Sequence, residues 1–321
     1  MSSLDTQMNT PSIRSRSTYG RRHLGDRAIV NLFIWPSLVL LIAMNVFPLF
    51  YSLYLSFTKY SAIAGKAPEW IGFKNFVDIL NDPLMWKYFA TTGRYALFSV
   101  GLQTLLGFGL AMLVHEKFKG SGFITTLILI PMMISPVVVG LFWKLMYNPT
   151  FGFFNYLIGF PNPIRGPDML ASSFARKPVP GLALWAVIIV DVWMWSPFVM
   201  LLVLSGLKAI PGYLYEAAAI DRASSWFQFW RITLPQVAPL LLIAILFRTI
   251  EAFKSFDLVM GMTGGGPGDQ TELIAVNLYR QAFLGQWNTG RASALAYIIL
   301  IIIIAVSNLY ILYLNRMRGE A

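Results

Sequence analysis

Six long stretches almost free of charge constrain this chain more than any other feature. They cover residues 28–58, 95–114, 120–143, 178–207, 232–247 and 292–315, and Asp191 is the one charged residue within them. A helix needs about 20 apolar residues to cross the hydrocarbon core of a bilayer. The stretches therefore predict an all-α integral membrane protein with six transmembrane helices.

Composition agrees with this fold class, and the first and last apolar runs indicate the domain boundaries. The chain has 321 residues, of which 56% are hydrophobic and only 12% are charged, whereas about 25% of the residues in a soluble domain are charged. Residues 1–26 are expected to form a basic cytoplasmic tail, 27–316 the transmembrane domain and 317–321 a second cytoplasmic tail. The predicted spans lie at about 28–57, 94–115, 120–146, 180–207, 236–260 and 292–315.

The charges that flank the first span predict its orientation. Five arginines precede it (Arg14, Arg16, Arg21, Arg22 and Arg27), whereas only Lys59 and Lys66 follow closely. Positive residues stay on the cytoplasmic side of a membrane, so the N-terminus is expected inside, and six spans return the C-terminus to the same side. The apolar run is too long for a cleaved signal and lacks an A-x-A site, which favours an uncleaved anchor.

The residue inventory excludes several kinds of chemistry. The chain contains no cysteine and two histidines, so neither a thiolate site nor a histidine metal cluster is expected. It has no G-x-x-x-x-G-K-[ST] sequence and therefore no predicted ATPase site of its own. The formal charge of +10 indicates contact with anionic lipid, not with nucleic acid. The glycine-rich "TGGGPGDQT" lacks the phosphate-binding lysine and is predicted to be a flexible turn on the outer side.

The cytoplasmic loop at 208–235, between the fourth and fifth spans, is mixed in polarity and prone to helix formation. Pro211 suits the first turn of a helix, and Pro235 constrains the start of the fifth span. The pattern alone leaves two interpretations open. The helix either lies on the inner leaflet of the membrane or forms a docking site for a cytoplasmic partner.

A family resemblance favours the docking site. The sequence "EAAAIDRASSWFQFWRITLPQVAP" resembles the EAA loop of binding-protein-dependent ABC importer permeases, and Glu216, Ala217, Ala218 and Asp221 fit its pattern. The usual glycine of that loop is replaced by Arg222, which must either continue the helix or accept a strained turn. Three further segments resemble the sugar-importing, maltose-importer-like branch, so the likeness covers roughly residues 28–315: "WIGFKNFVDILNDPLMW", "NPTFGFFNYLIG" and "SFDLVMGMTGGGPGDQT".

The resemblance implies a permease subunit of an ATP-driven sugar importer in the bacterial inner membrane. Its EAA helix would be a coupling helix, with Glu216 as the expected charged contact to an ATP-binding subunit. The implied partners are a second homologous permease, two ATP-binding subunits that bind ATP and Mg²⁺, and an extracytoplasmic solute-binding protein that delivers a sugar or sugar derivative. This chain would hold no cofactor and would not itself be an enzyme.

Charged residues within the fifth span are candidates for the substrate path. The spacing i, i+3, i+7 places Arg248, Glu251 and Ser255 on one face of a helix. This face either lines a polar path or holds an Arg248–Glu251 ion pair. The resemblance to the maltose importer implies substrate-path positions at Met194, Trp195, Phe198, Arg248, Glu251, Ala252 and Ser255. The charges of Arg248 and Glu251 suggest the further hypothesis of a charged sugar derivative.

Alternatives of other classes stay open. Glycerol phosphate or another small polar solute fits the same branch of importers. An ion-coupled secondary transporter would usually have more spans and inverted repeats. A polytopic membrane enzyme would need clustered catalytic groups, which His23 and His115 are too far apart in the sequence to supply.

Overall fold

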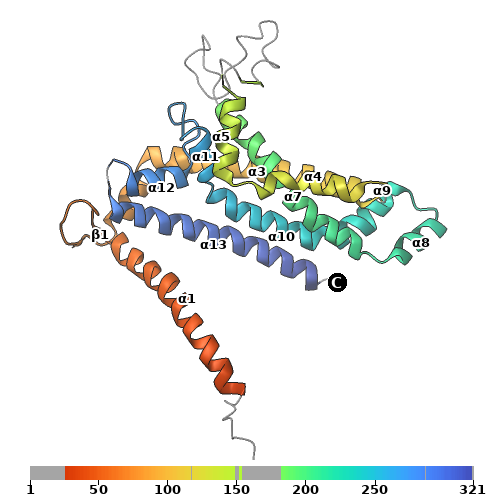
Figure 1. Ribbon diagram of the computed structural model, residues 1–321, viewed down its shortest axis with the longest axis horizontal. Helices are drawn as coiled ribbons and strands as arrows, with labels where there is room; N and C mark the ends of the chain where they lie inside the picture. Colours follow the sequence, from red (N-terminus) through yellow and green to blue (C-terminus); the bar gives the residue numbers. More distant parts are fainter. Residues whose placement is uncertain (1–25, 117, 149–151, 154–181, 286, 320–321) are drawn as a thin grey trace, which may run out of the picture. The chain divides into compact units, whose positions relative to one another are not determined.

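The computed structural model describes residues 26–116, 118–148, 152–153, 182–285 and 287–319, and it is almost entirely helical in this part (Figure 1). Two short strands are the exception: β1, Thr58–Lys59, pairs antiparallel with β2, Glu69–Trp70. The predicted all-α membrane fold is confirmed. Nearly all of the basic tail and most of the second outer loop lie outside the described residues.

The chain divides into two compact units, residues 1–51 and 52–321. The described part of the first unit belongs to helix α1, Asp26–Ser56, which matches the first predicted span and continues into the second unit. Five helices are long and apolar enough to cross a membrane, and a bent pair makes a sixth if it is counted as one span; this holds for the described residues.

The second unit is built around α3, Pro83–His115, packed along α7, Leu182–Ala209. Gly107 makes this packing close, because a Cβ there would lie 2.6 Å from the Ser196 carbonyl oxygen and from Val199 Cβ. Helix α10, Leu234–Phe253, packs on both, and α13, Thr289–Gly319, packs on α10 (Figure 1). The buried core follows the α3–α7 contact.

The third predicted span is not one straight helix. It consists of α4, Ser121–Met133, and α5, Pro136–Met146, which are bent by 95°. Ile134 and Ser135 have extended backbone. This is expected for Ser135, because a residue that precedes a proline avoids the helical conformation. The prediction of a continuous helix at 120–146 was wrong because Pro136 cannot donate the hydrogen bond that would close the turn.

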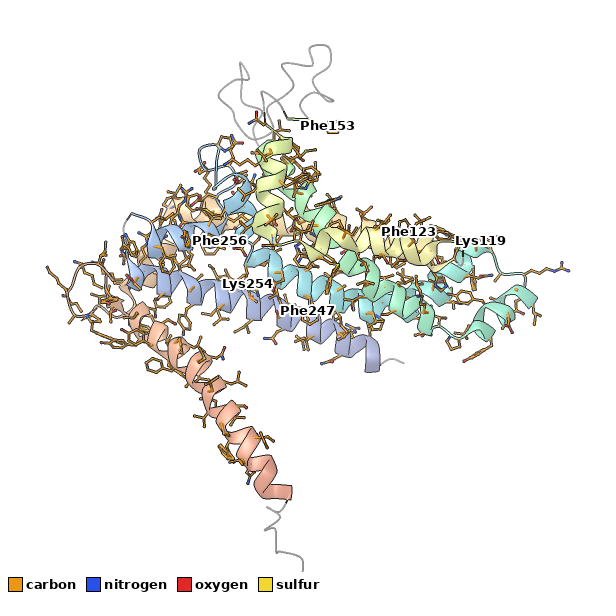
Figure 2. All side chains as sticks on the ribbon, in the orientation of Figure 1. Lys119, Phe123, Phe153, Phe247, Lys254 and Phe256 are labelled. Carbon is orange, nitrogen blue, oxygen red and sulfur yellow. The ribbon has the colours of Figure 1, made fainter. Side chains whose placement is uncertain are left out.

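The fifth predicted span is also broken. Helix α10 ends at Phe253, and α11, Asp257–Met262, begins after a short break that Lys254 and Phe256 mark in Figure 2. The prediction that Ser255 shares a helix face with Arg248 was therefore wrong. Helix α11 packs against α5 across Gly140 and Gly261, whose Cα atoms allow close backbone approach.

The segment between α7 and α10 folds into three short pieces. They are α8, Gly212–Ile220, α9, Ser225–Gln228, and the π-helical turn η1, Phe229–Thr233, which runs directly into α10. Helices α8 and α9 lie at one end of the second unit, whereas α12, Ile274–Phe283, lies at the other end (Figure 1).

The α12 end is held together by side chains that bond to backbone. Asn75, in α2 (Lys74–Leu80), donates to the carbonyls of Ser56 and Thr58, both at 2.9 Å. In the glycine-rich segment, the Thr271 hydroxyl donates to the Gly266 carbonyl at 2.8 Å, and Arg280 donates to the carbonyl of Gly264. This segment is thus a hydrogen-bonded turn, and its flexibility stays a prediction.

Candidate functional site

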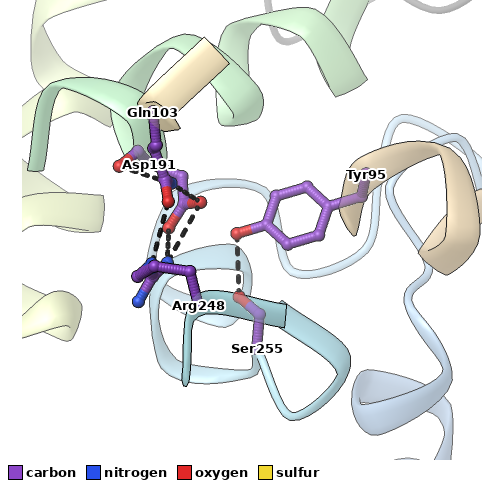
Figure 3. Close-up of polar contacts among 5 residues, drawn as sticks. All are labelled: Tyr95, Gln103, Asp191, Arg248 and Ser255. Carbon is purple, nitrogen blue, oxygen red and sulfur yellow. Dashed lines mark hydrogen bonds and ion pairs between the residues drawn. The ribbon is translucent and has the colours of Figure 1, made fainter. Parts of the chain in front are cut away.

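A buried ion pair lies where α3, α7 and α10 meet. Arg248 of α10 approaches both carboxylate oxygens of Asp191 of α7, at 3.4 and 3.5 Å, and both residues are 3% exposed. Gln103 of α3 joins them: its amide nitrogen donates to Asp191 Oδ2 at 2.6 Å, and its amide oxygen accepts from Arg248 Nε at 2.8 Å (Figure 3). The three side chains form a closed polar network between three helices.

The network explains how these charges are tolerated in an apolar bundle. A charged group without a partner is costly at membrane depth, so such groups pair with one another and turn toward the protein interior. The ring of Trp195 covers the Arg248 guanidinium with 4.5 Å between Cζ and the ring centroid, a cation–π geometry. Arg248 is therefore held on several sides, and its positive charge is balanced within this chain.

A small polar cavity of about 90 Å³ adjoins the ion pair. It lies at the two helix breaks, because Pro136 opens α5 and residues 254–256 separate α10 from α11. Tyr95 of α3 and Ser255 are hydrogen-bonded beside it, with 3.1 Å between their oxygens (Figure 3). Irregular backbone at membrane depth is typical of cavities that take up polar solutes. The lining residues are Pro136, Asp191, Trp195, Arg248, Glu251, Lys254, Ser255, Phe256, Asp257 and Leu258.

The cavity brings together four of the residues predicted for the substrate path: Trp195, Arg248, Glu251 and Ser255. The other three do not reach it. Met194 and Ala252 are buried in the hydrophobic core, and Phe198 packs against a second core cluster near α3. Whether these positions contact substrate stays a prediction.

The alternative of an Arg248–Glu251 ion pair was wrong. Glu251 pairs instead with Lys254 at 2.7 Å, and both side chains are about half exposed at the rim of the cavity. Arg248 turns to Asp191 because that carboxylate lies in the buried helix interface.

Two residues of this site were not predicted from the sequence: Gln103 in the polar network and Tyr95, which bonds to Ser255 beside the cavity. Gln103 is an amide within a charge-free run, and Tyr95 lies at the start of that run. The available signal was Asp191, since a lone acid in a predicted span requires a partner on another helix. That partner turned out to be Arg248, assisted by Gln103.

The second candidate site is helix α8 with the turn that follows it, which together hold the predicted coupling residues. Glu216 and Ala217 are exposed, Ala218 is buried, and Asp221 caps the end of the helix. Arg222 adopts a left-handed conformation with φ 52°, so the usual glycine turn forms despite the substitution. The backbone bonds from Ala223 to Ala218 at 2.9 Å and from Arg222 to Ala219 at 3.1 Å define a Schellman motif.

Helix α8 is attached to the start of α10. The hydroxyl oxygens of Tyr215 and Thr233 lie 2.9 Å apart, and Thr233 is the last residue before α10. Ile220 at the end of α8 is 82% exposed, and Tyr213 is 65% exposed. The helix thus presents a partly apolar surface while remaining linked to the bundle. Within the described residues, no group of three or more His, Cys, Asp or Glu side chains is placed to hold a metal ion.

Comparison with known proteins places this arrangement in context. A family model described as "binding-protein-dependent transport system inner membrane component" matches residues 103–318. A probable ABC transporter permease protein of Sinorhizobium fredii is 36% identical over 292 residues, which cover 89% of this chain and 90% of that protein. The trehalose/maltose transport system permease protein MalF of Thermococcus litoralis is 32% identical over 291 residues, or 90% of this chain and 94% of that protein.

A solved structure shares the fold. One chain of a bacterial ABC transporter involved in the import of the acidic polysaccharide alginate superimposes with a TM-score of 0.75. The match covers 91% of this chain and 97% of that chain at 19% sequence identity. At this identity the likeness concerns the helical architecture alone.

Proposed function

This chain belongs to the family of binding-protein-dependent transport system inner membrane components, and we propose that it forms the translocation path of an ATP-driven importer for a sugar or sugar derivative. The names of its relatives support the solute class, since one of them is a trehalose/maltose transport permease. One structural observation carries the proposal: α10 links a polar cavity among the spans to an exposed helix at one end of the bundle.

The proposed mechanism uses this link. Tyr215 bonds α8 to Thr233, and α10 then leads to Arg248 at the cavity. A rigid-body displacement of α8 by a partner would therefore move the cavity wall formed by α10 relative to α3 and α7. Coupling of this kind requires a two-state element that both sites influence, and the helix α10 is the candidate element.

The partners follow from the same proposal. Two ATP-binding subunits would bind ATP and Mg²⁺ and contact α8, a second homologous permease would complete the path, and an extracytoplasmic binding protein would deliver the solute. Both termini would lie in the cytoplasm of a bacterium, with α8 at the inner face and α12 at the outer face. The exposed carboxylate of Glu216 is the proposed charged contact with the ATPase.

The cavity favours an uncharged solute over an anionic one such as glycerol phosphate. Its two cations, Arg248 and Lys254, are both paired with carboxylates of this chain. A buried guanidinium with its charge balanced offers little attraction to a further anion. We therefore replace the hypothesis of a charged sugar by that of a neutral one. A cognate binding protein that retains only anionic sugars would contradict this choice.

The experiment that tests the proposed function is purification of the tagged chain from its native host in mild detergent. The expected complex contains a second permease and an ATPase, and the binding protein stimulates its MgATP hydrolysis. Glu216→Lys should abolish the stimulation, whereas Glu116→Lys, which changes an exposed glutamate just after α3, should retain it. A chain that purifies alone, without ATPase activity, would overturn the proposal.

A further inference from the structure

Three aromatic side chains beside α8 have no role in the proposed function. Trp226, Phe227 and Trp230, here called the aromatic collar, are 72%, 52% and 49% exposed on α9 and η1. Large exposed apolar patches mark surfaces that contact a partner or a membrane. The collar therefore requires an occupant.

The depth of the collar follows from the length of its helix. Residues 225–253 form one continuous helical run of 29 residues, which is about 43 Å at 1.5 Å per residue. The hydrocarbon core measures about 30 Å, so this run extends beyond the core by more than 10 Å in total. Arg231 is exposed and cannot remain in hydrocarbon, which fixes the excess at the α9 end. The collar then lies at the level of the lipid headgroups.

Ring contacts fix the direction in which the collar points. Phe229 packs edge-to-face on Phe108 of α3, with ring centroids 5.8 Å apart, and so anchors this segment to the bundle. Trp226 and Trp230 contact each other edge-to-face at 5.6 Å and remain exposed. Tryptophan is enriched at membrane–water interfaces because its ring is amphipathic.

The collar segment itself carries positive charge, although the exposed Asp221 precedes it and the exposed Glu116 lies three residues before Lys119. From residue 222 to residue 233 the chain has two arginines, Arg222 and Arg231, and no acidic residue; both arginines are exposed. Lys119, also exposed, lies at the same end of the second unit (Figure 2). Exposed cations near the membrane surface favour anionic phospholipid.

We propose that the aromatic collar is a lipid-docking surface that seats in the headgroup layer of the inner leaflet and prefers anionic phospholipid. The collar continues the membrane-spanning helix α10 without interruption, whereas the Arg222 turn separates it from α8. This role rests on the proposed function: the collar would hold the α9 end of the helix at a constant depth, so that displacement of α8 would tilt α10 at the cavity and would not shift the whole subunit.

The absence of cysteine from the chain allows a direct test. Spin labels are attached to Trp226→Cys and Trp230→Cys and, as a control on α8, to Ile220→Cys. Each labelled full-length chain is placed in lipid nanodiscs of phosphatidylcholine with or without phosphatidylglycerol. Collision rates with oxygen, which concentrates in lipid, and with a water-soluble nickel chelate report depth.

Both collar labels are expected to show an oxygen-to-nickel ratio about threefold or more above that of the Ile220 label, as interfacial sites should. Phosphatidylglycerol should raise the ratio further, and Arg231→Gln should remove that increase. The proposal is overturned if the collar labels are as accessible to nickel as the Ile220 label. It is also overturned if they become protected only when the ATPase is added, since the collar would then be a protein contact.

Discussion

Asp191, Arg248 and Gln103 show at the residue scale how a charge is accommodated inside an apolar bundle. The carboxylate and the guanidinium lie 3.4 Å apart, and the Gln103 amide bonds to both of them. A buried pair of this kind adds little net stability compared with apolar residues, but the loss of one member leaves an uncompensated charge. The pair is therefore most sensitive to single substitutions.

Asp191→Asn or Arg248→Gln should each lower the free energy of unfolding by about 3–5 kcal/mol. The double variant should lose clearly less than the sum of the two, because neither charge is then left alone. Unfolding in detergent micelles measures these values. Glu251→Gln breaks the exposed pair with Lys254 and serves as the control, with a change below about 1 kcal/mol. Single variants as stable as this control would show that the pair is not buried as described.

Arg222 adopts a conformation that glycine would adopt more easily. Its φ of 52° is left-handed, which costs an L-residue with a side chain about 1–2 kcal/mol. Arg222→Gly should relieve this cost, although glycine also gives the unfolded chain more conformational freedom. The net effect should be an increase of about 0.5–1 kcal/mol in the free energy of unfolding. Ala223→Gly, one position later and without a positive φ, should instead destabilise. The midpoints of thermal unfolding compare the two variants, and a loss of stability in Arg222→Gly would contradict the assignment of the turn.

At the scale of helices, the contact between α3 and α7 depends on a missing side chain. Gly107→Ala would place a methyl group 2.6 Å from the Ser196 carbonyl oxygen and from Val199 Cβ. The helices must separate, and the expected loss is about 1–3 kcal/mol, as for other overpacked cores. Gly109→Ala is the matched control on the same helix, because nothing lies within 4 Å of its added methyl group. Equal stability of the two variants in a detergent unfolding assay would refute this packing.

The α12 end contains an acid that should make stability depend on pH. Burial raises the pKa of Glu272 above its ordinary value of 4.5, although the nearby Arg280 guanidinium lowers it in part. The folded state therefore holds the proton to a higher pH than the unfolded state does. Stability should fall as pH rises from about 4.5 through the folded pKa, by at most about 1.4 kcal/mol per pH unit.

Glu272→Gln tests this pH dependence because the amide does not titrate. Unfolding midpoints of the variant should change less than those of the parent chain across the same pH window. Glu69→Gln, at an exposed position on β2, is the control and should keep the slope of the parent. An unchanged slope in Glu272→Gln would mean that another group is responsible.

The sequence predicted the helices of this fold well but not their interruptions. Charge-free runs determine where a chain can enter a membrane, and the observed helices α1, α3, α7, α10 and α13 overlap the predicted spans. The breaks at 134–135 and 254–256 depend on how α5 and α11 pack, with Gly140 against Gly261. Pro136 gave a local signal for the first break, but no proline marks the second.

The sequence predicted several residues of the candidate site, but it did not predict which residue pairs with Arg248. Arg248 stood out because a charged residue is notable within a span, whereas Trp195 was expected only from the family resemblance. Local spacing offered Glu251, its neighbour on the helix, as one alternative partner of Arg248. The observed partner, Asp191, is 57 residues away and is brought close only by the packing of α7 on α10. Long-range contacts of this kind cannot be read from local spacing.

For the whole molecule, the two sites are parts of one element. Helix α10 begins at the bond between Thr233 and Tyr215 of α8 and ends beside the cavity at the α10–α11 break. The two helix breaks, at residues 134–135 and 254–256, meet at this cavity. Under the proposed function, α10 would convert displacement of α8 into a change at the solute path.

ATP-driven uptake by the reconstituted transporter tests this account most directly. The complete complex is placed in proteoliposomes with the binding protein outside and MgATP inside, and both sugar uptake and ATP hydrolysis are followed. The parent complex is expected to take up sugar only when both the binding protein and ATP are present, whereas the Glu216→Lys complex should lose that uptake. Uptake at the parental rate by Glu216→Lys, or uptake driven by an ion gradient without ATP, would contradict the account.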